Sequence, residues 1–263
     1  MKSAKRVLVV GPSWVGDMMM AQALFILLKQ HNPDCRIDVL APAWSLPLLD
    51  HMPEVGDTIV SPFQHGQLAL RERYRLGKSL RSQKYDQAIL LPNSFKSALV
   101  PFWAGIPLRT GFTGEMRRGL LNDTRKLDAA RLPKTVMRFL SLGLPADAPF
   151  PAEYARPCLQ IDQQQIETSL SSLGLSAPRT PVLVLCPGAE YGPAKQWPAK
   201  HFAELANTHL DKGWQVWLLG SANDADICSD INRLTYERCQ DLSGKTELGQ
   251  VIDLMALATA IAV

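Results

Sequence analysis

The chain has 263 residues, of which 46% are hydrophobic and 20% charged, with 17 glycines, 19 prolines and 5 cysteines. This composition excludes a disordered chain, a collagen-like repeat and a small disulfide-stabilised scaffold, and the length suits two domains or one large α/β domain. Residues 1–150 carry 20 Lys+Arg and 12 Asp+Glu, a net charge of +8, whereas residues 151–263 carry 8 and 13, a net charge of −5. The first half therefore predicts an anionic partner.

Cysteine usage and hydropathy indicate the compartment. The cysteines are odd in number, widely spaced and contain no C-x-x-C pair, which favours a reduced, intracellular protein. A basic N-terminus precedes only a short apolar run at 7–10, too short for a signal peptide. No stretch approaches the ~20 apolar residues of a membrane span. We expect a cytoplasmic protein that is at most peripheral at a membrane.

Short β-branched runs alternate with amphipathic stretches of helical length, which predicts βαβ units and parallel sheets. We expect strands at 6–10, 37–41, 86–91, 182–186 and 215–219, and helices at 17–31, 68–83, 133–142, 162–173, 198–211, 224–236 and 246–258. The proline-rich region 143–157 predicts a connection between domains.

These breaks divide the chain into an N-terminal Rossmann-like domain at 1–160, a linker region at 161–180 and a C-terminal Rossmann-like domain at 181–263. The last residues, 258–263, resemble a helix exit that leads into a buried strand. Because a domain seldom ends in a core strand with nothing to cover it, we expect a second domain that is truncated at its C-terminus.

The first strand–helix junction, residues 11–18, has Gly-x4-Gly spacing but lacks the Lys and Ser/Thr of a phosphate loop. Instead Asp17 follows, at a helix N-terminus on the carboxyl edge of a sheet, where α/β folds bind ligands. The helix dipole favours its ionised form, which suits a general base. The alternative is that Asp17 simply caps the helix.

The second junction, residues 186–198, is a glycine-bearing loop with one cation, Lys195, before a helix. Such a loop is able to neutralise a diphosphate, or Lys195 is an ordinary solvated lysine beside a structural tryptophan. The third junction, residues 219–226, places Asp224 where a ribose hydroxyl could bind. Asp224 and Asp226 also form a D-x-D pattern, typical of metal-dependent glycosyl transfer, although acids are common in a first helical turn.

Two further loops carry polar or basic residues. Asn93 and Lys96 follow the strand at 86–91, and Arg117 and Arg118 lie in a Gly- and Thr-bearing stretch at 110–119 that is a candidate anion site. Further basic residues accumulate in the same half, and they are Arg71, Arg73, Arg75, Lys78, Arg81, Lys84, Arg109, Arg125 and Lys126. Of these, Arg71, Arg75 and Lys78 could share one helix face, which is usually a solvated face. The five histidines form no zinc motif, so we expect no metal site.

Four motifs then resemble the inverting bacterial heptosyltransferases, which have the GT-B fold. They are residues 11–20 (GPSWVGDMMM), 91–98 (LPNSFKSA), 114–117 (GEMR) and 186–195 (CPGAEYGPAK). The resemblance covers the whole chain. It implies two Rossmann-like domains, of which the first binds the lipopolysaccharide inner core and the second binds ADP-heptose.

The resemblance also implies the reaction, in which heptose passes from ADP-heptose to the first heptose of the lipopolysaccharide core, with inversion and without a metal or other cofactor. Asp17 would be the general base, and Lys195 would stabilise the departing diphosphate. The remaining implied contacts are Gly188, Ser221 and Asp224 for the donor, and Ser13, Gly16, Asn93, Lys96, Arg117 and Arg118 for the acceptor. The lipid acceptor implies peripheral contact with the cytoplasmic face of the inner membrane.

One departure from the family pattern is a missing downstream Asn-Asp-Ser/Thr-Gly-x-x-His segment, which implies an incomplete donor pocket. Two alternatives therefore stay open. One is a nucleotide-sugar epimerase on a similar frame. The other is a non-catalytic module in which only the basic domain binds its ligand.

Overall fold

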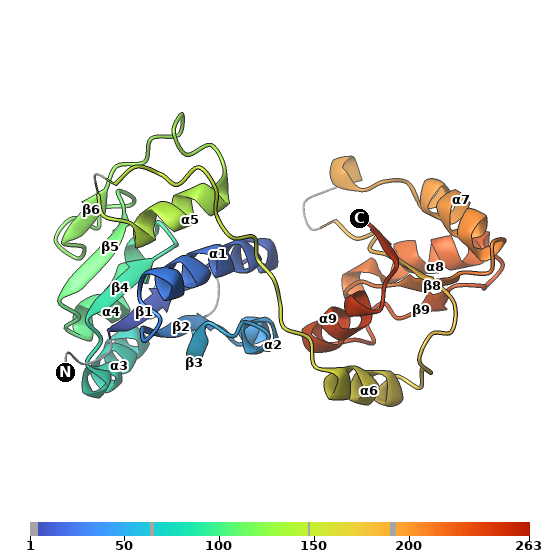
Figure 1. Cartoon of the computed structure of the whole chain (residues 1–263), viewed down its shortest axis with the longest axis horizontal. Helices are drawn as coiled ribbons and strands as arrows, with labels where there is room; N and C mark the ends of the chain where they lie inside the picture. The colour runs from blue at the N-terminus through green and yellow to red at the C-terminus, as the bar shows by residue number, and fades with distance from the viewer. Residues whose placement is uncertain (1–4, 64–65, 147, 190–192) are drawn as a thin grey trace. The chain divides into compact units, whose positions relative to one another are not determined.

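The computed structural model describes residues 5–63, 66–146, 148–189 and 193–263. The chain divides into two compact units, Met1–Gln160 and Ile161–Val263, shown in Figure 1. We call them the first and second units and describe each by itself.

The first unit is built on a six-stranded parallel sheet in the order β3-β2-β1-β4-β5-β6. Its strands are β1 (Arg6–Val10), β2 (Arg36–Pro42), β3 (Val55–Ser61), β4 (Gln87–Leu90), β5 (Leu108–Phe112) and β6 (Asp123–Arg125). The strand order reverses between β1 and β4, so these two strands flank the switch point where open α/β sheets bind ligands.

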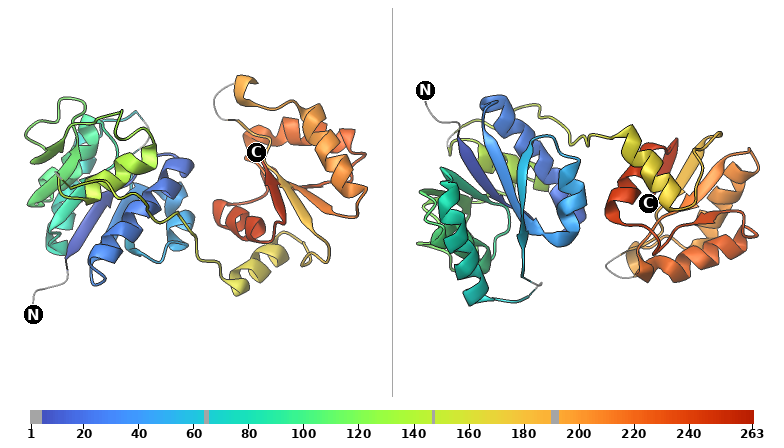
Figure 2. Two further views of the ribbon diagram at one scale, coloured as in Figure 1. Left: turned by 45° about the horizontal axis from the view of Figure 1, so that its top comes forward. Right: turned by 90° about the horizontal axis from the view of Figure 1, so that it is seen from below.

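Helices cover both faces of this sheet, as Figure 2 shows. They are α1 (Val15–His31), α2 (Leu46–Asp50), α3 (Leu70–Leu80), α4 (Leu99–Trp103) and α5 (Thr135–Gly143). Helices α1 and α5 pack together through Ala23, Leu27 and Leu140. Helices α3 and α4 cover a core that contains alternate residues of β1, Leu8 and Val10. Burial of both faces explains why the sequences of β1 and β4 are almost continuously apolar.

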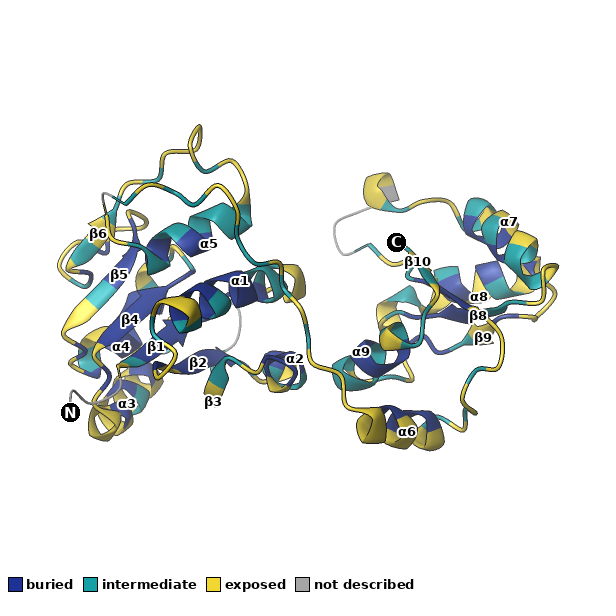
Figure 3. Cartoon of the chain, viewed as in Figure 1, coloured by how far each residue is buried: buried dark blue, intermediate teal, exposed yellow. Residues whose placement is uncertain are grey.

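The second unit contains a four-stranded parallel sheet in the order β10-β7-β8-β9. Its elements are β7 (Val182–Leu185), β8 (Gln215–Leu218), β9 (Gln240–Asp241), β10 (Ala260–Ala262), α6 (Gln163–Ser172), α7 (Ala199–Leu210), α8 (Ala225–Leu234) and α9 (Leu248–Ala256). Phe202 of α7 and Ile231 of α8 pack on one face of the sheet, whereas Ile166 of α6 and Leu254 of α9 pack on the other. Figure 3 shows this alternation of buried and exposed helix faces.

The predicted linker region at 161–180 contains helix α6, which belongs to the second unit. Its buried Ser169 donates a hydrogen bond of 2.6 Å from Oγ to Oδ2 of buried Asp253 in α9. This polar contact and the apolar cluster around Ile166 fix α6 on the sheet. The chain thus passes from one unit to the other before α6.

Several elements differ from the sequence-based expectations. Strands β3, β5, β6 and β9 were not predicted. The edge strands β3, β6 and β9 are short or only partly buried, so their apolar signal is weak. Strand β5 is internal, but its sequence LRTGF contains no continuous apolar run. The predicted helix at 68–83 begins at Leu70 and ends at Leu80, followed by a 3-10 turn and by Lys84 with a φ of 51°. The strand predicted within 258–263 is β10, which pairs in parallel with β7.

The contact of α3 with α4 yields a test of the packing. A Cβ added at Gly77 would lie 2.7 Å from Trp103 Cβ and 2.9 Å from the Val100 carbonyl oxygen. Alanine gains about 1 kcal/mol in helix propensity over glycine, but overpacking costs about 1–3 kcal/mol. Because the opposing atoms are backbone and Cβ atoms, they cannot rotate away, and the steric cost dominates.

We therefore expect Gly77→Ala to lower the urea midpoint of unfolding at constant m-value. Arg75→Ala, on the exposed face of the same helix, is the control and should leave the midpoint nearly unchanged. A higher midpoint for Gly77→Ala would contradict the close approach of the two helices.

Candidate active site

The predicted site residues of the first unit lie in three loops at one edge of its sheet. Strands β1, β4 and β5 are neighbours and run in parallel, so the loops that follow them leave from the same edge. Ser13 and Asp17 follow β1, Asn93 and Lys96 follow β4, and Arg117 and Arg118 follow β5. The structure thus brings the residues predicted for base and acceptor binding to one edge.

Asp17 lies in the first turn of α1, but it does not cap the helix. The N-cap residue is Trp14, which has an extended backbone and no side-chain cap hydrogen bond. The alternative that Asp17 serves only as an N-cap is therefore wrong. Asp17 is partly exposed, and the nearby Ser13 and Gly16 are exposed. A Cβ at Gly16 would meet nothing within 4 Å, so there is open space beside the helical turn that carries Asp17.

The environment of Asp17 changes its acidity. Partial burial raises the pKa of this carboxyl above its ordinary value, because desolvation penalises the charged form. The helix dipole acts in the other direction, because it favours the ionised form. A raised pKa makes the carboxylate a stronger base, which is the property needed to accept a proton from a sugar hydroxyl.

Arg117 is buried, with 2% of its surface exposed, and its guanidinium donates only to protein acceptors among the described residues. Nε and Nη2 donate to the Phe112 carbonyl at 3.1 and 2.6 Å. Nη1 donates to the Pro92 carbonyl at 2.7 Å and to Ser97 Oγ at 3.3 Å, and Nη2 donates to Asn93 Oδ1 at 3.1 Å. This geometry gives Arg117 a positioning role, because its guanidinium orients Asn93. The acceptor contact of Arg117 that the motif implies stays a prediction.

The two loops joined by Arg117 make further contacts with one another. The backbone N–H of Glu115 donates to the Asn93 carbonyl at 3.2 Å, and the Phe95 N–H donates to Glu115 Oε2 at 2.9 Å. Gly114 approaches the Asn93 carbonyl so closely that a Cβ there would collide with the oxygen. The GEMR motif therefore interlocks with the loop that carries Asn93 and Lys96.

Arg73 is a second buried arginine, and the sequence analysis gave it no role of its own. Its guanidinium donates to the carbonyls of Leu68 at 2.7 Å and Lys96 at 3.1 Å, and it lies 3.8 Å from the centroid of the Phe63 ring. Burial lowers the pKa of Arg73. Its position two residues from each exposed neighbour, Arg71 and Arg75, was the available signal, because such spacing places it on another helix face.

Arg118 is exposed and lines a pocket of about 400 Å³, whose other lining residues are Thr113, Gly114, Met116, Arg117 and Thr124. Asn93 is exposed and Lys96 is partly exposed. These three side chains remain accessible to a ligand at the sheet edge.

In the second unit, three of the predicted donor residues come together. The loops after β7 and β8 leave neighbouring parallel strands. Asp224 Oδ2 accepts hydrogen bonds from the Ser221 N–H at 2.8 Å and from Ser221 Oγ at 2.7 Å. A Cβ at Gly188 would collide with the Asp224 carboxylate, so a larger residue there would displace the Asp224 side chain from its present position. Asp224 therefore joins Ser221 and Gly188 in one cluster.

Lys195 lies in the 3-10 turn Pro193–Lys195 and is exposed. Residues 190–192 of the same motif lie outside the described residues. Nearby Trp197 packs on α7, stacked on His201 at a centroid distance of 5.3 Å and edge-on to Phe202 at 4.9 Å. The diphosphate contact and the solvated-lysine alternative both remain compatible with this placement.

Cys186, which begins this loop, is not a nucleophile at neutral pH. Burial and the charge of Asp224 raise the pKa of its thiol to about 11, so the thiol stays protonated. Among the described residues, no group of three or more His, Cys, Asp or Glu side chains is placed to hold a metal ion. No helix in the described part of the chain is long and apolar enough to cross a membrane.

Comparisons with known proteins agree with this geometry. The sequence matches glycosyltransferase family 9 (heptosyltransferase) over residues 73–262. Lipopolysaccharide heptosyltransferase 2 of Escherichia coli is 48% identical over 97% of this chain and 76% of the relative. Lipooligosaccharide heptosyltransferase 2 of Haemophilus influenzae is 43% identical with the same coverage.

A solved structure, that of E. coli ADP-heptose lps heptosyltransferase II, matches with a TM-score of 0.87 and 44% identity. The match covers 97% of this chain and 78% of that one. The predicted α/β fold of GT-B type is thereby confirmed.

The buried guanidinium of Arg117 predicts a large effect of a conservative substitution. Lysine keeps the charge but cannot reach the Phe112 and Pro92 carbonyls together, so Arg117→Lys should lower the free energy of unfolding by about 2 kcal/mol or more. The measurement is urea denaturation, with Arg118→Lys at the exposed neighbouring position as the control. Equal stability of the two variants would contradict the positioning role.

Proposed function

The chain belongs to glycosyltransferase family 9, the heptosyltransferases, and on that premise we propose its substrates and the roles of its residues. The donor is ADP-heptose, and the acceptor is the first heptose of the lipopolysaccharide inner core. The observation that carries this proposal is the 48% identity to lipopolysaccharide heptosyltransferase 2 over 97% of the chain.

Asp17 acts as the general base. Its carboxylate takes the proton from the acceptor hydroxyl, whose oxygen forms a bond to the anomeric carbon of the heptose. The bond from that carbon to the ADP oxygen breaks on the opposite face, so the configuration inverts and ADP leaves with the electron pair. The raised pKa of Asp17 and the open space at Gly16 support this role.

The second unit binds the donor. Lys195 neutralises charge that develops on the departing diphosphate, an electrostatic role that requires no metal or other cofactor. Asp224, held by Ser221, accepts a hydrogen bond from the ribose, and Gly188 lets the nucleotide approach the backbone closely.

The first unit binds the acceptor through accessible polar groups at its sheet edge. Asn93, Lys96 and Arg118 contact the sugar core, with Ser13 and Gly16 beside the base. The basic charge of this half suits an acceptor that carries carboxylates and phosphates. Because that acceptor is a lipid, the protein works in peripheral contact with the cytoplasmic face of the inner membrane.

The direct test is incubation of the protein with ADP-heptose and the heptose-bearing acceptor. We expect ADP release together with addition of one heptose to the acceptor. Conversion of ADP-heptose to an isomer without acceptor would indicate an epimerase instead. Acceptor binding with neither donor binding nor transfer would indicate a non-catalytic binding module.

Asp17→Asn should reduce transfer by about 10²–10⁴-fold, the usual contribution of a general base, while ADP affinity stays near that of the wild type. In the wild type, transfer should fall as the pH drops through the Asp17 pKa. The inflection should lie above the ordinary aspartate range, because burial raises this pKa.

Stability provides the control for this variant. Ionised Asp17 costs stability at neutral pH, and protonation removes that cost as the pH falls. The Asp17→Asn variant should therefore unfold at the same temperature as the wild type or at a higher one. Lost donor affinity with normal turnover would refute the assignment of Asp17 as the base.

Lys195→Ala should weaken ADP binding, because a cation near the diphosphate is lost. Isothermal titration with ADP measures the effect, and Lys200→Ala, an exposed lysine in α7, is the matched control. Unchanged ADP affinity for Lys195→Ala would support the solvated-lysine alternative.

A further inference from the structure

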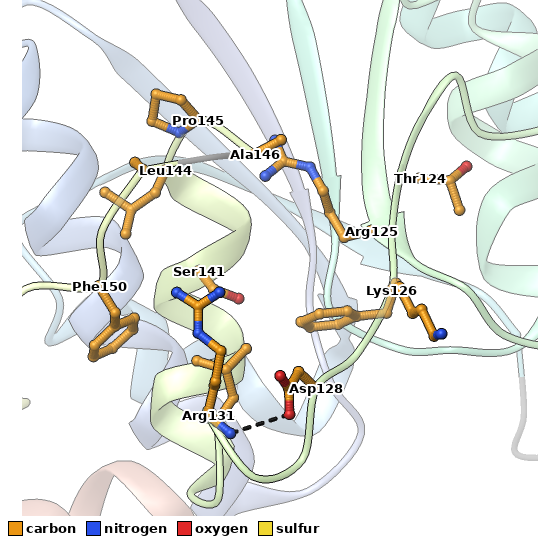
Figure 4. Close-up of a pocket in the computed structure, with 13 residues that line it drawn as sticks. Thr124, Arg125, Lys126, Asp128, Arg131, Ser141, Leu144, Pro145, Ala146 and Phe150 are labelled. Carbon is orange, nitrogen blue, oxygen red and sulfur yellow. Dashed lines mark hydrogen bonds between the residues drawn. The ribbon is translucent and has the colours of Figure 1, made fainter.

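A pocket of about 260 Å³ lies in the first unit beyond the loops described above. It opens where the chain leaves β5 and β6, between the loop that follows β6 and the C-terminal end of α5 (Figure 4). None of the proposed catalytic, donor or acceptor residues lines it. We call it the β6 pocket and define it by Phe112, Arg125, Lys126, Arg131, Ser141 and Phe150.

Three cations line the β6 pocket. Arg125 is held in place by Asp123, which accepts from Nε at 2.6 Å and from Nη2 at 2.8 Å. This pairing lowers the pKa of Asp123, so the carboxylate stays charged and the guanidinium stays fixed. Among the described residues, the side chains of Lys126 and Arg131 have no hydrogen bond or ion pair, and both are exposed. Figure 4 shows Arg131 reaching toward Ser141, with Arg125 on the other side of the pocket.

The carboxylate among the described lining residues, that of Asp128, accepts hydrogen bonds from backbone N–H groups. Asp128 Oδ1 accepts from the N–H groups of Ala130 at 3.0 Å and Arg131 at 3.2 Å, which closes the turn before α5. The loop is held further by Arg138, whose Nε donates to the Leu132 carbonyl at 3.0 Å. The cations are thus presented on an organised turn, and the described lining has an excess of positive charge.

The other walls are apolar. Phe112 is buried, and Phe150 packs edge-on against Tyr154 with a centroid distance of 6.0 Å. A pocket of this size is too small for a nucleotide but accommodates a carboxylate or phosphate with part of the sugar ring that bears it. Guanidinium groups bind both anions through paired hydrogen bonds.

The position of the pocket connects it to the acceptor edge. Strand β6 neighbours β5 in the sheet, and Thr124 lines both the β6 pocket and the pocket that contains Arg118. Accessible cations therefore follow one another along this edge, from Lys96 through Arg118 to Arg131. An acceptor with a single charged group would use only part of this row.

We propose that the β6 pocket binds a second anionic group of the acceptor, a carboxylate or phosphate on a sugar away from the reacting hydroxyl, with Arg131 as its principal ligand and Arg125 and Lys126 in support. This inference rests on the proposed function. The pocket sets acceptor affinity and takes no part in donor binding or proton transfer.

The test compares Arg131→Gln with Arg75→Gln, which removes the same charge from an exposed helix face of the same unit. The dissociation constant for acceptor, presented in neutral detergent micelles, should rise about tenfold or more for Arg131→Gln, as expected for a lost charge-assisted contact. It should stay unchanged for Arg75→Gln. ADP affinity and the unfolding midpoint should remain at wild-type values in both variants.

Modified acceptors identify the anion. If a phosphate occupies the pocket, removing it from the acceptor should raise the dissociation constant for the wild type. For Arg131→Gln, the intact and the dephosphorylated acceptor should have the same dissociation constant. If a carboxylate occupies the pocket, methyl esterification of the acceptor should raise the dissociation constant for the wild type but not for Arg131→Gln. Equal acceptor affinity of wild type and Arg131→Gln overturns the β6 pocket proposal, whereas failure of the wild type to bind the acceptor at all overturns the proposed function.

Discussion

The sheet edge that carries Asn93, Lys96 and Arg118 depends on the hydrogen bonds of one buried guanidinium. Arg117 joins the end of β5 to the loop after β4 through the carbonyls of Phe112 and Pro92 and through the side chain of Asn93. A neutral side chain there would leave buried carbonyls without donors, a cost that folding cannot easily offset. Since Gly114 and Glu115 contact the same loop, the position of each accessible group at this edge follows from that central contact.

The same use of arginine recurs through the first unit and changes the meaning of its charge. Arg73 and Arg109 donate to backbone carbonyls, and Arg6 and Arg36 bind the buried carboxylate of Asp38. Many of the arginines behind the net charge of +8 therefore hold the fold together through internal hydrogen bonds and ion pairs. Other cations remain exposed, among them Arg71, Arg75 and Lys78 of α3 and, in the loops after β5 and β6, Arg118, Lys126 and Arg131.

The sequence was sufficient for the buried strands β1 and β7 and for the strand–helix junctions after them, because continuous apolar runs and glycine-bearing junctions are strong local signals. It was insufficient for β6, which contains three polar residues and is defined by pairing with β5. It was also insufficient for the role of Arg117. A motif places an arginine in a loop, but only the fold determines whether its donors meet carbonyls or a ligand.

The electrostatic surroundings of Asp17 have a chemical consequence. A lysine or arginine beside the carboxylate would lower its pKa and make it a weaker base. The shift at Asp17 instead arises from burial alone among the described residues, and its direction is upward. The loop after β1 contributes Ser13, Trp14 and Gly16 but no cation, whereas the loops after β4, β5 and β6 carry Lys96, Arg118 and Arg131. In the proposed function, this arrangement lets cations attract the acceptor while no cation of the β1 loop weakens Asp17 as a base.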